Sequence, residues 1–193
     1  MRQRRRTGPE EPSPGEADRG PAADPKSVAR TIVLTKLTAR ARSRQELADA
    51  LAQRGVPDDV ATAVLQRFGE VGLVDDAAFA RAWVESRQAS RGLSRRALAV
   101  ELRRKGVDAE IVTDILTSID DETEYAAATA LVTRKLRATR HASPQARWRQ
   151  LVGVLARRGY SPGVAMRVIG DVLKAEAAAS GDEDAAEVPS SLS

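Results

Sequence analysis

The chain has 193 residues, no cysteine, a net charge of +4 at pH 7, and only two Trp, two Tyr and two Phe. The lack of cysteine excludes disulfides, cysteine-ligated metals and thiol catalysis, and no run of about 18 apolar residues is present to span a membrane. The sequence also lacks the apolar segment of a signal peptide near its start, so we expect a soluble cytoplasmic protein.

The two ends of the sequence differ in composition from its middle. Residues 1–26 mix proline, glycine and charge with almost no apolar side chains, and residues 176–193 are rich in alanine and acid. Such segments cannot bury enough apolar surface to fold, so we predict that both are disordered tails. The folded part then spans 27–175, and its core must be filled mainly by Leu, Val, Ile and Ala.

One helical pattern occurs three times between these ends. Each copy has two leucines four residues apart, then a basic residue, a glycine, and Val or Tyr. The glycines are Gly55, Gly106 and Gly159, at spacings of 51 and 53 residues. A period near 50 residues built from helical signals alone is typical of a helical repeat protein. Such an array presents a long surface to a partner, so we expect a binding or regulatory protein.

The first repeat, 27–74, is predicted to contain three helices. Ser43 and Glu46 form a capping box at the start of the second helix, because each side chain can accept a free backbone amide hydrogen there. Gly55 ends that helix in a left-handed conformation, and a cation in the last turn complements the helix dipole. Pro57 is expected to be the first residue of the third helix.

The second repeat, 75–120, and the third, 121–175, follow the same order of helices. Ser94 and Ser143 are placed to cap their second helices. The sequence has no alternating run typical of a β-strand. The predicted fold is therefore all-α, a tandem array of three three-helix (helix-turn-helix-like) repeats, elongated and curved.

Several distinctive residues receive a structural interpretation. Trp83 is predicted to lie in the core. Trp148 either packs at the interface with a neighbouring repeat or stays partly exposed beside Arg147 and Arg149 to contact a partner, and we favour packing. His141 lies in a predicted loop without a scaffold for nucleophilic catalysis. The acidic run at 120–124 lacks the ligand spacing of a calcium loop and is interpreted as helix capping. No catalytic, cofactor-binding or metal site is predicted.

Charge is unevenly distributed within the repeats. Residues 134–158 carry eight basic side chains and no acid, and 81–105 carry eight against two acids, whereas 108–124 carry seven acids and no base. Such blocks indicate an anionic partner. The candidate partner-binding or DNA-binding residues are the basic ones of the second helices: Arg95, Arg96, Arg103, Arg104, Lys105, Arg147, Arg149, Arg157 and Arg158.

The segment from Gly72 to Val107 is the most distinctive part of the sequence. It reads Gly-Leu-Val-Asp-Asp, then Phe79, Trp83 and Arg87, and later a leucine followed by Lys-Gly-Val. This order resembles the RecX family, the regulatory proteins of the RecA recombinase. The resemblance covers about 27–173 and implies tandem three-helix units with a concave basic surface.

The resemblance also implies a function and partners. Members of the family bind RecA–DNA filaments, lodge in the filament groove, and inhibit strand exchange, ATP hydrolysis and co-protease activity. We therefore expect a monomer that binds the RecA recombinase and its nucleoprotein filament, with single- or double-stranded DNA as a second partner. The alternative is a tandem helix-turn-helix protein that binds DNA without RecA, because the first repeat is similar to that motif. An enzyme is a distant third hypothesis.

Overall fold

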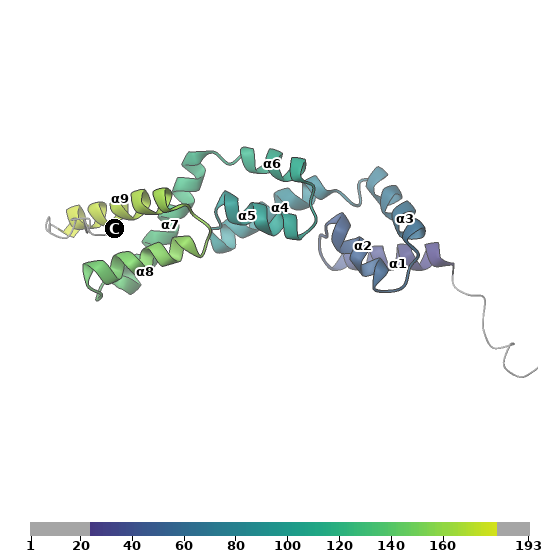
Figure 1. The fold of residues 1–193 in the computed structure, drawn as a ribbon, viewed down its shortest axis with the longest axis horizontal. Coiled ribbons are helices and arrows are strands. Elements are labelled where there is room, and N and C mark those ends of the chain that lie inside the picture. The colour runs from purple at the N-terminus through teal and green to yellow at the C-terminus, as the bar shows by residue number, and fades with distance from the viewer. Residues whose placement is uncertain (1–23, 181–193) are drawn as a thin grey trace, which may run out of the picture.

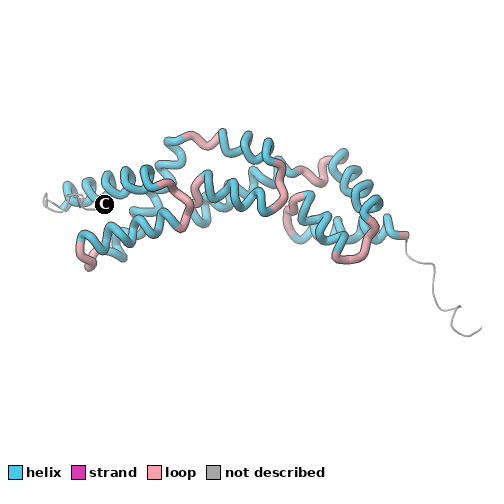
Figure 2. The backbone as a smooth tube through the Cα atoms, viewed as in Figure 1, coloured by secondary structure: helices cyan, strands magenta, loops and turns pink. Residues whose placement is uncertain are grey.

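The computed structural model describes residues 24–180, which fold into nine α-helices without a β-strand in that range (Figure 1). In chain order the helices are α1 (Pro25–Ala39), α2 (Arg44–Ala52), α3 (Asp58–Glu70), α4 (Asp76–Arg91), α5 (Arg95–Arg104), α6 (Ala109–Thr117), α7 (Asp121–Thr139), α8 (Pro144–Ala156) and α9 (Pro162–Ser180). They form three successive groups of three, and Figure 2 shows these groups as one elongated, curved array. The predicted all-α array of three repeats is confirmed.

The folded part is longer than predicted at both ends. α1 begins at Pro25 because the Asp24 side chain accepts hydrogen bonds from two amides of the first turn. α9 continues to Ser180, beyond the predicted boundary at 175, and the Glu176 carboxylate pairs with the Arg147 guanidinium from α8. Alanine and acid indicated a tail here, but alanine is the strongest helix former and this acid has a basic partner. The rest of the predicted tails, 1–23 and 181–193, lies outside the described residues.

Two truncated chains should test this boundary. A chain spanning 24–180 should melt at the temperature of the full chain, because the removed residues are predicted to bury no apolar surface. A chain from 24 to Ala175 also loses the buried Ala177 and the Glu176–Arg147 ion pair. That loss is about 1 kcal/mol, so this chain should melt about 2–4 °C lower in calorimetry. Equal melting temperatures for the two truncated chains would contradict a structural role for the last turn of α9.

The second helices begin at the predicted serine caps. The side chains of Ser43, Ser94 and Ser143 each accept the amide hydrogen of the third residue of their helix. The Glu46 side chain also accepts the amide hydrogen of Ser43, so the predicted capping box is confirmed. Pro57 differs from the prediction: its ψ of 142° is extended, so it is the N-cap of α3 rather than the first helical residue.

The helix α8 starts earlier in its repeat than α2 and α5 do. The first of the two repeated leucines is the fourth residue of α2 (Leu47) and of α5 (Leu98), but the eighth of α8 (Leu151). α8 therefore has about one additional turn at its N-terminus. As a result, Arg147 occupies the position that the capping serines hold in the other two repeats.

Each repeat has its own hydrophobic core. The three helices of a repeat pack against one another, and their buried side chains form three separate clusters. The repeated leucine pairs lie at the centre of these clusters and are almost completely buried: Leu47 and Leu51, Leu98 and Leu102, Leu151 and Leu155. Trp148 is buried in the third cluster, so it packs as favoured, but it does so in the core of its own repeat rather than at the interface with a neighbouring repeat. The glycines after these helices, Gly55, Gly106 and Gly159, have φ of 69°, 72° and 85°, as predicted for left-handed helix ends.

Polar contacts join repeat 1 to repeat 2. The Ser43 hydroxyl donates to the carbonyl oxygen of Lys105 at 2.6 Å, and the Arg44 amide donates to the Asp76 carboxylate at 2.7 Å. The Lys105 ammonium also pairs with the Glu46 carboxylate at 2.5 Å. The start of α2 therefore lies against the end of α5 in the next repeat. The joint consists mainly of hydrogen bonds and ion pairs, because the two cores remain separate.

Candidate partner-binding groove

The joint between repeats 2 and 3 resembles the joint between repeats 1 and 2, because the start of one second helix again contacts the end of the next second helix. The Ser94 amide donates to the carbonyl oxygen of Arg158 at 3.0 Å, and the Tyr160 hydroxyl donates to the carbonyl oxygen of Gly92 at 3.1 Å. The start of α5 therefore lies against the end of α8. Both bonds are accepted by backbone carbonyls at helix ends, where such groups lack partners within the helix. This contact brings an exposed face of α5 beside the basic end of α8.

A groove of about 750 Å³ opens at this joint. It is lined by the end of α4, one face of α5 and the residues that end α8. Four of the lining side chains are aliphatic, and we call them the floor: Leu93, Ala97, Val100 and Ala156. Five are arginines, and we call them the rim: Arg91, Arg96, Arg104, Arg157 and Arg158. Glu101 is the only acidic residue among those that line it, so the groove attracts anions.

The nine predicted binding residues do not form one continuous surface. Four of them line the groove, and these are Arg96, Arg104, Arg157 and Arg158. Two others, Arg103 and Arg149, are exposed but lie outside it. The remaining three, Arg95, Lys105 and Arg147, form ion pairs within the molecule.

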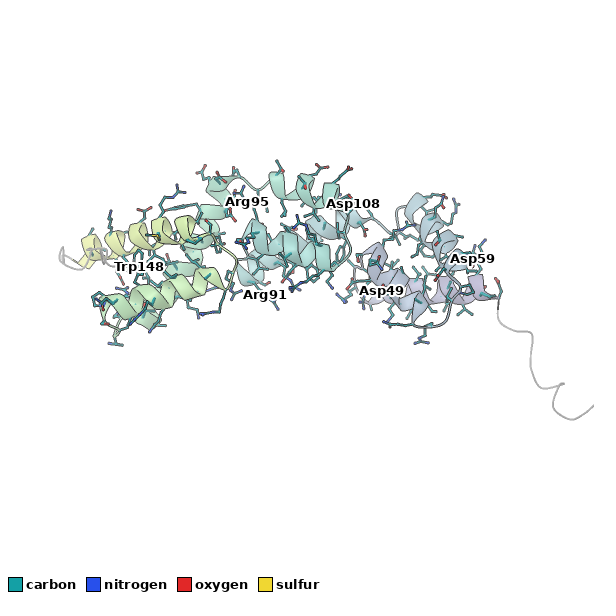
Figure 3. The ribbon with its side chains drawn as sticks, viewed as in Figure 1. Asp49, Asp59, Arg91, Arg95, Asp108 and Trp148 are labelled. Carbon is teal, nitrogen blue, oxygen red and sulfur yellow. The ribbon has the colours of Figure 1, made fainter. Side chains whose placement is uncertain are left out.

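Arg95 holds repeat 2 to the acidic start of α7. Its Nε donates to the Glu124 carboxylate at 2.9 Å, one of its terminal nitrogens donates to the Ile119 carbonyl at 3.0 Å, and another pairs with Asp121. The hydrogen bond to Asp121 is the main cause that raises the pKa of Arg95. Figure 3 places Arg95 on the opposite side of the array from Arg91, away from the groove. Arg95 therefore acts as a structural residue.

The acidic run at 120–124 is accounted for by these contacts. Asp120 accepts the amide hydrogen of Thr123 at 2.7 Å and caps α7, as predicted. Asp121 and Glu124 are engaged by Arg95. Within residues 24–180, no three acidic or histidine side chains are grouped as a metal site would require.

Lys105 belongs to a cluster at the joint between repeats 1 and 2. Its Nζ lies 2.5 Å from the Glu46 carboxylate and 4.8 Å from the centre of the Trp83 ring. Burial raises the pKa of Glu46, but Lys105, the Ser43 amide and Arg40 together outweigh this effect, and the pKa is lowered. Arg87 lies 4.0 Å from the Trp83 ring centre, and the indole N–H donates to Glu101 at 2.9 Å. Trp83 is therefore half-buried at the edge of the second core rather than inside it, because its N–H needs a polar partner.

Five of the predicted residues remain available to a partner without breaking an ion pair. Arg147 is not one of them, since it pairs with Glu176 and donates to the Thr139 hydroxyl at 3.3 Å. Of the nine predicted residues, five are exposed and make no ion pair within residues 24–180: Arg96, Arg103, Arg104, Arg149 and Arg157. Arg158 is half-buried at the joint.

Arg91 is a residue of the groove that the sequence analysis missed. It lies at the end of α4, where Gly92 ends the helix with a φ of 58°, and not on the second helix of a repeat. Its guanidinium is 3.8 Å from the Glu101 carboxylate and remains exposed, so this pair contributes little to stability. The sequence pattern that could have identified Arg91 is a basic residue directly before a glycine that ends a helix.

Because of Tyr160, the stability of the protein should decrease at alkaline pH. Burial raises the pKa of its hydroxyl to about 12, above about 10 in an unfolded chain. The unfolded state therefore loses this proton first, and the stabilisation is complete below pH 10 and lost as the pH rises from about 10 to 12. Urea unfolding of the full chain should show this loss, at most roughly 3 kcal/mol, and Tyr160→Phe should remove it. At neutral pH the same substitution should cost about 1 kcal/mol, because the bond to the Gly92 carbonyl is absent. The same pH dependence in both proteins would contradict this assignment.

The comparisons with known proteins identify the family. Three models match in order: the first three-helix domain of RecX at residues 29–68, the second at 75–116 and the third at 122–169. A protein from Streptomyces lividans named regulatory protein RecX is 51% identical over 165 residues, which cover 85% of this chain and 88% of the relative. The chain belongs to the RecX family. Another protein of that name, from Thermobifida fusca, is 53% identical over 148 residues, or 77% of this chain and 80% of the relative.

Solved structures of RecX proteins share the fold. The crystal structure of RecX from Lactobacillus salivarius superposes with a TM-score of 0.70 at 20% identity, over 78% of this chain and 98% of that one. A second crystal structure, of a regulatory protein RecX, gives a TM-score of 0.68 at 22% identity, over 76% of this chain and 73% of that one. The resemblance that Gly72–Val107 suggested is confirmed. Among residues 24–180, no helix combines the length and apolar character needed to cross a bilayer.

Proposed function

We propose that this RecX protein binds the RecA recombinase and its nucleoprotein filament. In DNA repair and the SOS response it mainly inhibits the recombinase, ATPase and co-protease activities. Three observations support this proposal. The relatives at about 50% identity are named regulatory proteins, the array is elongated and curved, and its middle carries a groove rimmed by arginines. A RecA–DNA filament displays both phosphates and protein carboxylates to such a surface.

The groove is the observation that carries the proposal. Three of its arginines, Arg96, Arg104 and Arg157, are exposed and form no ion pair with residues 24–180. Guanidinium groups that lack an internal partner bind carboxylates or phosphates without first breaking a bond. An array bound along a filament also occupies the surface to which the second DNA molecule of strand exchange and the substrates of the co-protease activity bind. One bound molecule therefore lowers strand exchange and co-protease activity together.

The composition of the groove supports binding rather than catalysis. Its lining contains no histidine, serine or threonine, and its one carboxylate belongs to Glu101. That carboxylate accepts hydrogen bonds from the Trp83 indole and the Arg87 guanidinium. It is therefore a poor general base, and no nucleophile lies beside it.

The alternative, direct DNA recognition by tandem helix-turn-helix units, receives less support. In that motif the last helix enters the major groove, and its N-terminal residues contact the bases. Here α3 begins with Asp58 and Asp59, and α6 is preceded by Asp108, contains Glu110, and has no basic residue. Carboxylates at these positions repel DNA phosphates.

A co-sedimentation experiment tests the proposal against this alternative. RecA filaments assembled on single-stranded DNA, free RecA and the same DNA alone are each incubated with the full chain. We expect retention on filaments at protein concentrations that leave DNA alone almost unoccupied, together with inhibition of strand exchange. Equal retention on bare DNA, with a preference for base sequence and no effect on strand exchange, would favour the alternative.

A further inference from the structure

The floor of the groove distinguishes it from a simple phosphate-binding surface. Val100 is 40% exposed at the surface of α5, and Leu93, Ala97 and Ala156 line the same groove. A phosphodiester backbone is polar throughout and gains little from such a floor. An apolar side chain placed on Val100 would remove carbon surface of both partners from water, at about 25 cal/mol per Å². The floor therefore favours a partner that has an apolar group among its negative charges.

The aromatic residues give nucleic acid bases no platform on which to stack. Base stacking on aromatic rings is the main source of affinity for single strands beyond charge. All six Phe, Trp and Tyr residues of the sequence lie within the described range. Four of them are buried: Phe68, Phe79, Trp148 and Tyr160. The rings of the other two are covered by cations, Trp83 by Arg87 and Lys105, and Tyr125 by Arg167.

The rim of the groove fits carboxylates. Arg96 and Arg104 come from α5, and Arg157 comes from the end of α8, so the charges face the floor from two repeats. A planar guanidinium binds one carboxylate through two parallel hydrogen bonds. A chain with several acidic side chains can therefore cross the groove while an apolar side chain between them rests on Val100.

We propose that the groove between repeats 2 and 3 binds an acidic polypeptide segment that carries one apolar side chain. Its carboxylates pair with Arg96, Arg104 and Arg157, and its apolar side chain packs on Val100. The inference rests on the proposed function, because it assigns the groove to the protein component of the filament rather than to DNA. The DNA then lies against other parts of the array or makes no direct contact.

Fluorescence anisotropy with three probes tests this assignment on the full chain. The first probe is a labelled peptide of alternating glutamates and small residues with one central leucine, and the second has serine in place of that leucine. The third is a labelled oligothymidylate of the same net charge. We expect the leucine peptide to bind about tenfold more tightly than the serine peptide, the equivalent of about 1.4 kcal/mol.

Matched variants connect this difference to the groove. Val100→Gln should remove the tenfold preference for leucine and leave oligothymidylate binding unchanged. Val71→Gln is the control, because Val71 is also exposed (51%, against 40% for Val100) but lies outside the groove. Arg104→Gln should weaken the binding of both peptides, whereas Arg103→Gln should not, since Arg103 is exposed on the same helix but does not line the groove. Circular dichroism confirms that each variant is folded.

Two results would overturn the inference. One is equal affinity for the leucine and serine peptides. The other is an oligothymidylate that displaces the peptide and is weakened by Arg104→Gln but not by Arg103→Gln, which would assign the groove to nucleic acid. Failure of the proposed function is a different result, since it appears as an absence of filament binding by the unaltered chain in co-sedimentation.

Discussion

Reversal of two arginines that face the groove from different repeats should abolish most of the inhibition of RecA. In Arg104→Glu/Arg157→Glu, two favourable charges become repulsive toward the same anionic partner. Each lost charge-assisted hydrogen bond contributes about 1.5–3 kcal/mol, so the concentration needed to inhibit strand exchange should rise at least about a hundredfold. Binding to the filament should also depend less on salt, because fewer ions are displaced. Titration of RecA-dependent strand exchange measures the first effect, and co-sedimentation at several salt concentrations measures the second.

The matched control for this variant is Arg103→Glu/Arg149→Glu. It changes the charge by the same amount, and both residues are exposed and free of ion pairs within 24–180, but neither lines the groove. It should retain most of the inhibition. A second control reverses the four arginines near the start of the sequence: Arg2, Arg4, Arg5 and Arg6. Loss of inhibition in this last variant alone would refute the groove mechanism and assign the effect to the N-terminal segment.

Gly106→Val should destabilise the protein more than the same substitution at Gly55. Both glycines have a left-handed backbone, with φ of 72° and 69°, in which a β-branched side chain costs about 1–2 kcal/mol. Only Gly106 is also approached by another repeat: a Cβ there would lie well under 3.0 Å from the Cβ and Cγ of Gln45. The Cβ and Cγ of Gln45 are next to the backbone of α2, so they cannot move away from the added side chain unless α2 moves as well. The joint between repeats 1 and 2 must therefore open.

Two measurements separate strain within a helix end from loss of the joint. Urea unfolding should show a larger loss of stability for Gly106→Val than for Gly55→Val, by about 1–3 kcal/mol, the usual cost of overpacking. Small-angle scattering should show a change in overall dimensions for Gly106→Val only, because no atom lies within 4 Å of a Cβ at Gly55. Identical losses at the two positions would mean that the contact with Gln45 has no role.

Structural features that depend on residues nearby in the sequence, such as helix caps, could be predicted. Ion pairs between residues far apart in the sequence could not. Serine caps and left-handed glycines depend on residues three or four positions away, so Ser43, Ser94 and Gly106 were interpreted correctly. The acidic partners of Arg95, Arg147 and Lys105 lie 26 to 59 residues away, and nothing in the local pattern shows them.

The candidate site illustrates the same limit. Clusters of basic residues indicated an anionic partner, and four of the predicted arginines do line one groove. The apolar floor with Val100 was not predicted, because its members come from α5, from α8 and from the connection between α4 and α5, and meet only at the joint. Arg91 was missed for the same reason. The basic segments could be located from the sequence. The groove that they line could not, because it depends on the contact between Ser94 and Arg158 at the joint of repeats 2 and 3.

The additional turn at the start of α8 limits the number of repeats that this architecture can hold. In repeats 1 and 2 a small buried serine at the helix start lets the next repeat approach closely, as Ser43 does at the carbonyl of Lys105. In repeat 3 the equivalent position holds the bulky Arg147, whose guanidinium is already engaged by Glu176, and the helix begins three residues earlier, at Pro144. A gene duplication that appended a fourth unit would therefore give an unattached domain rather than a longer curve, unless the turn from Pro144 to Arg147 were deleted as well.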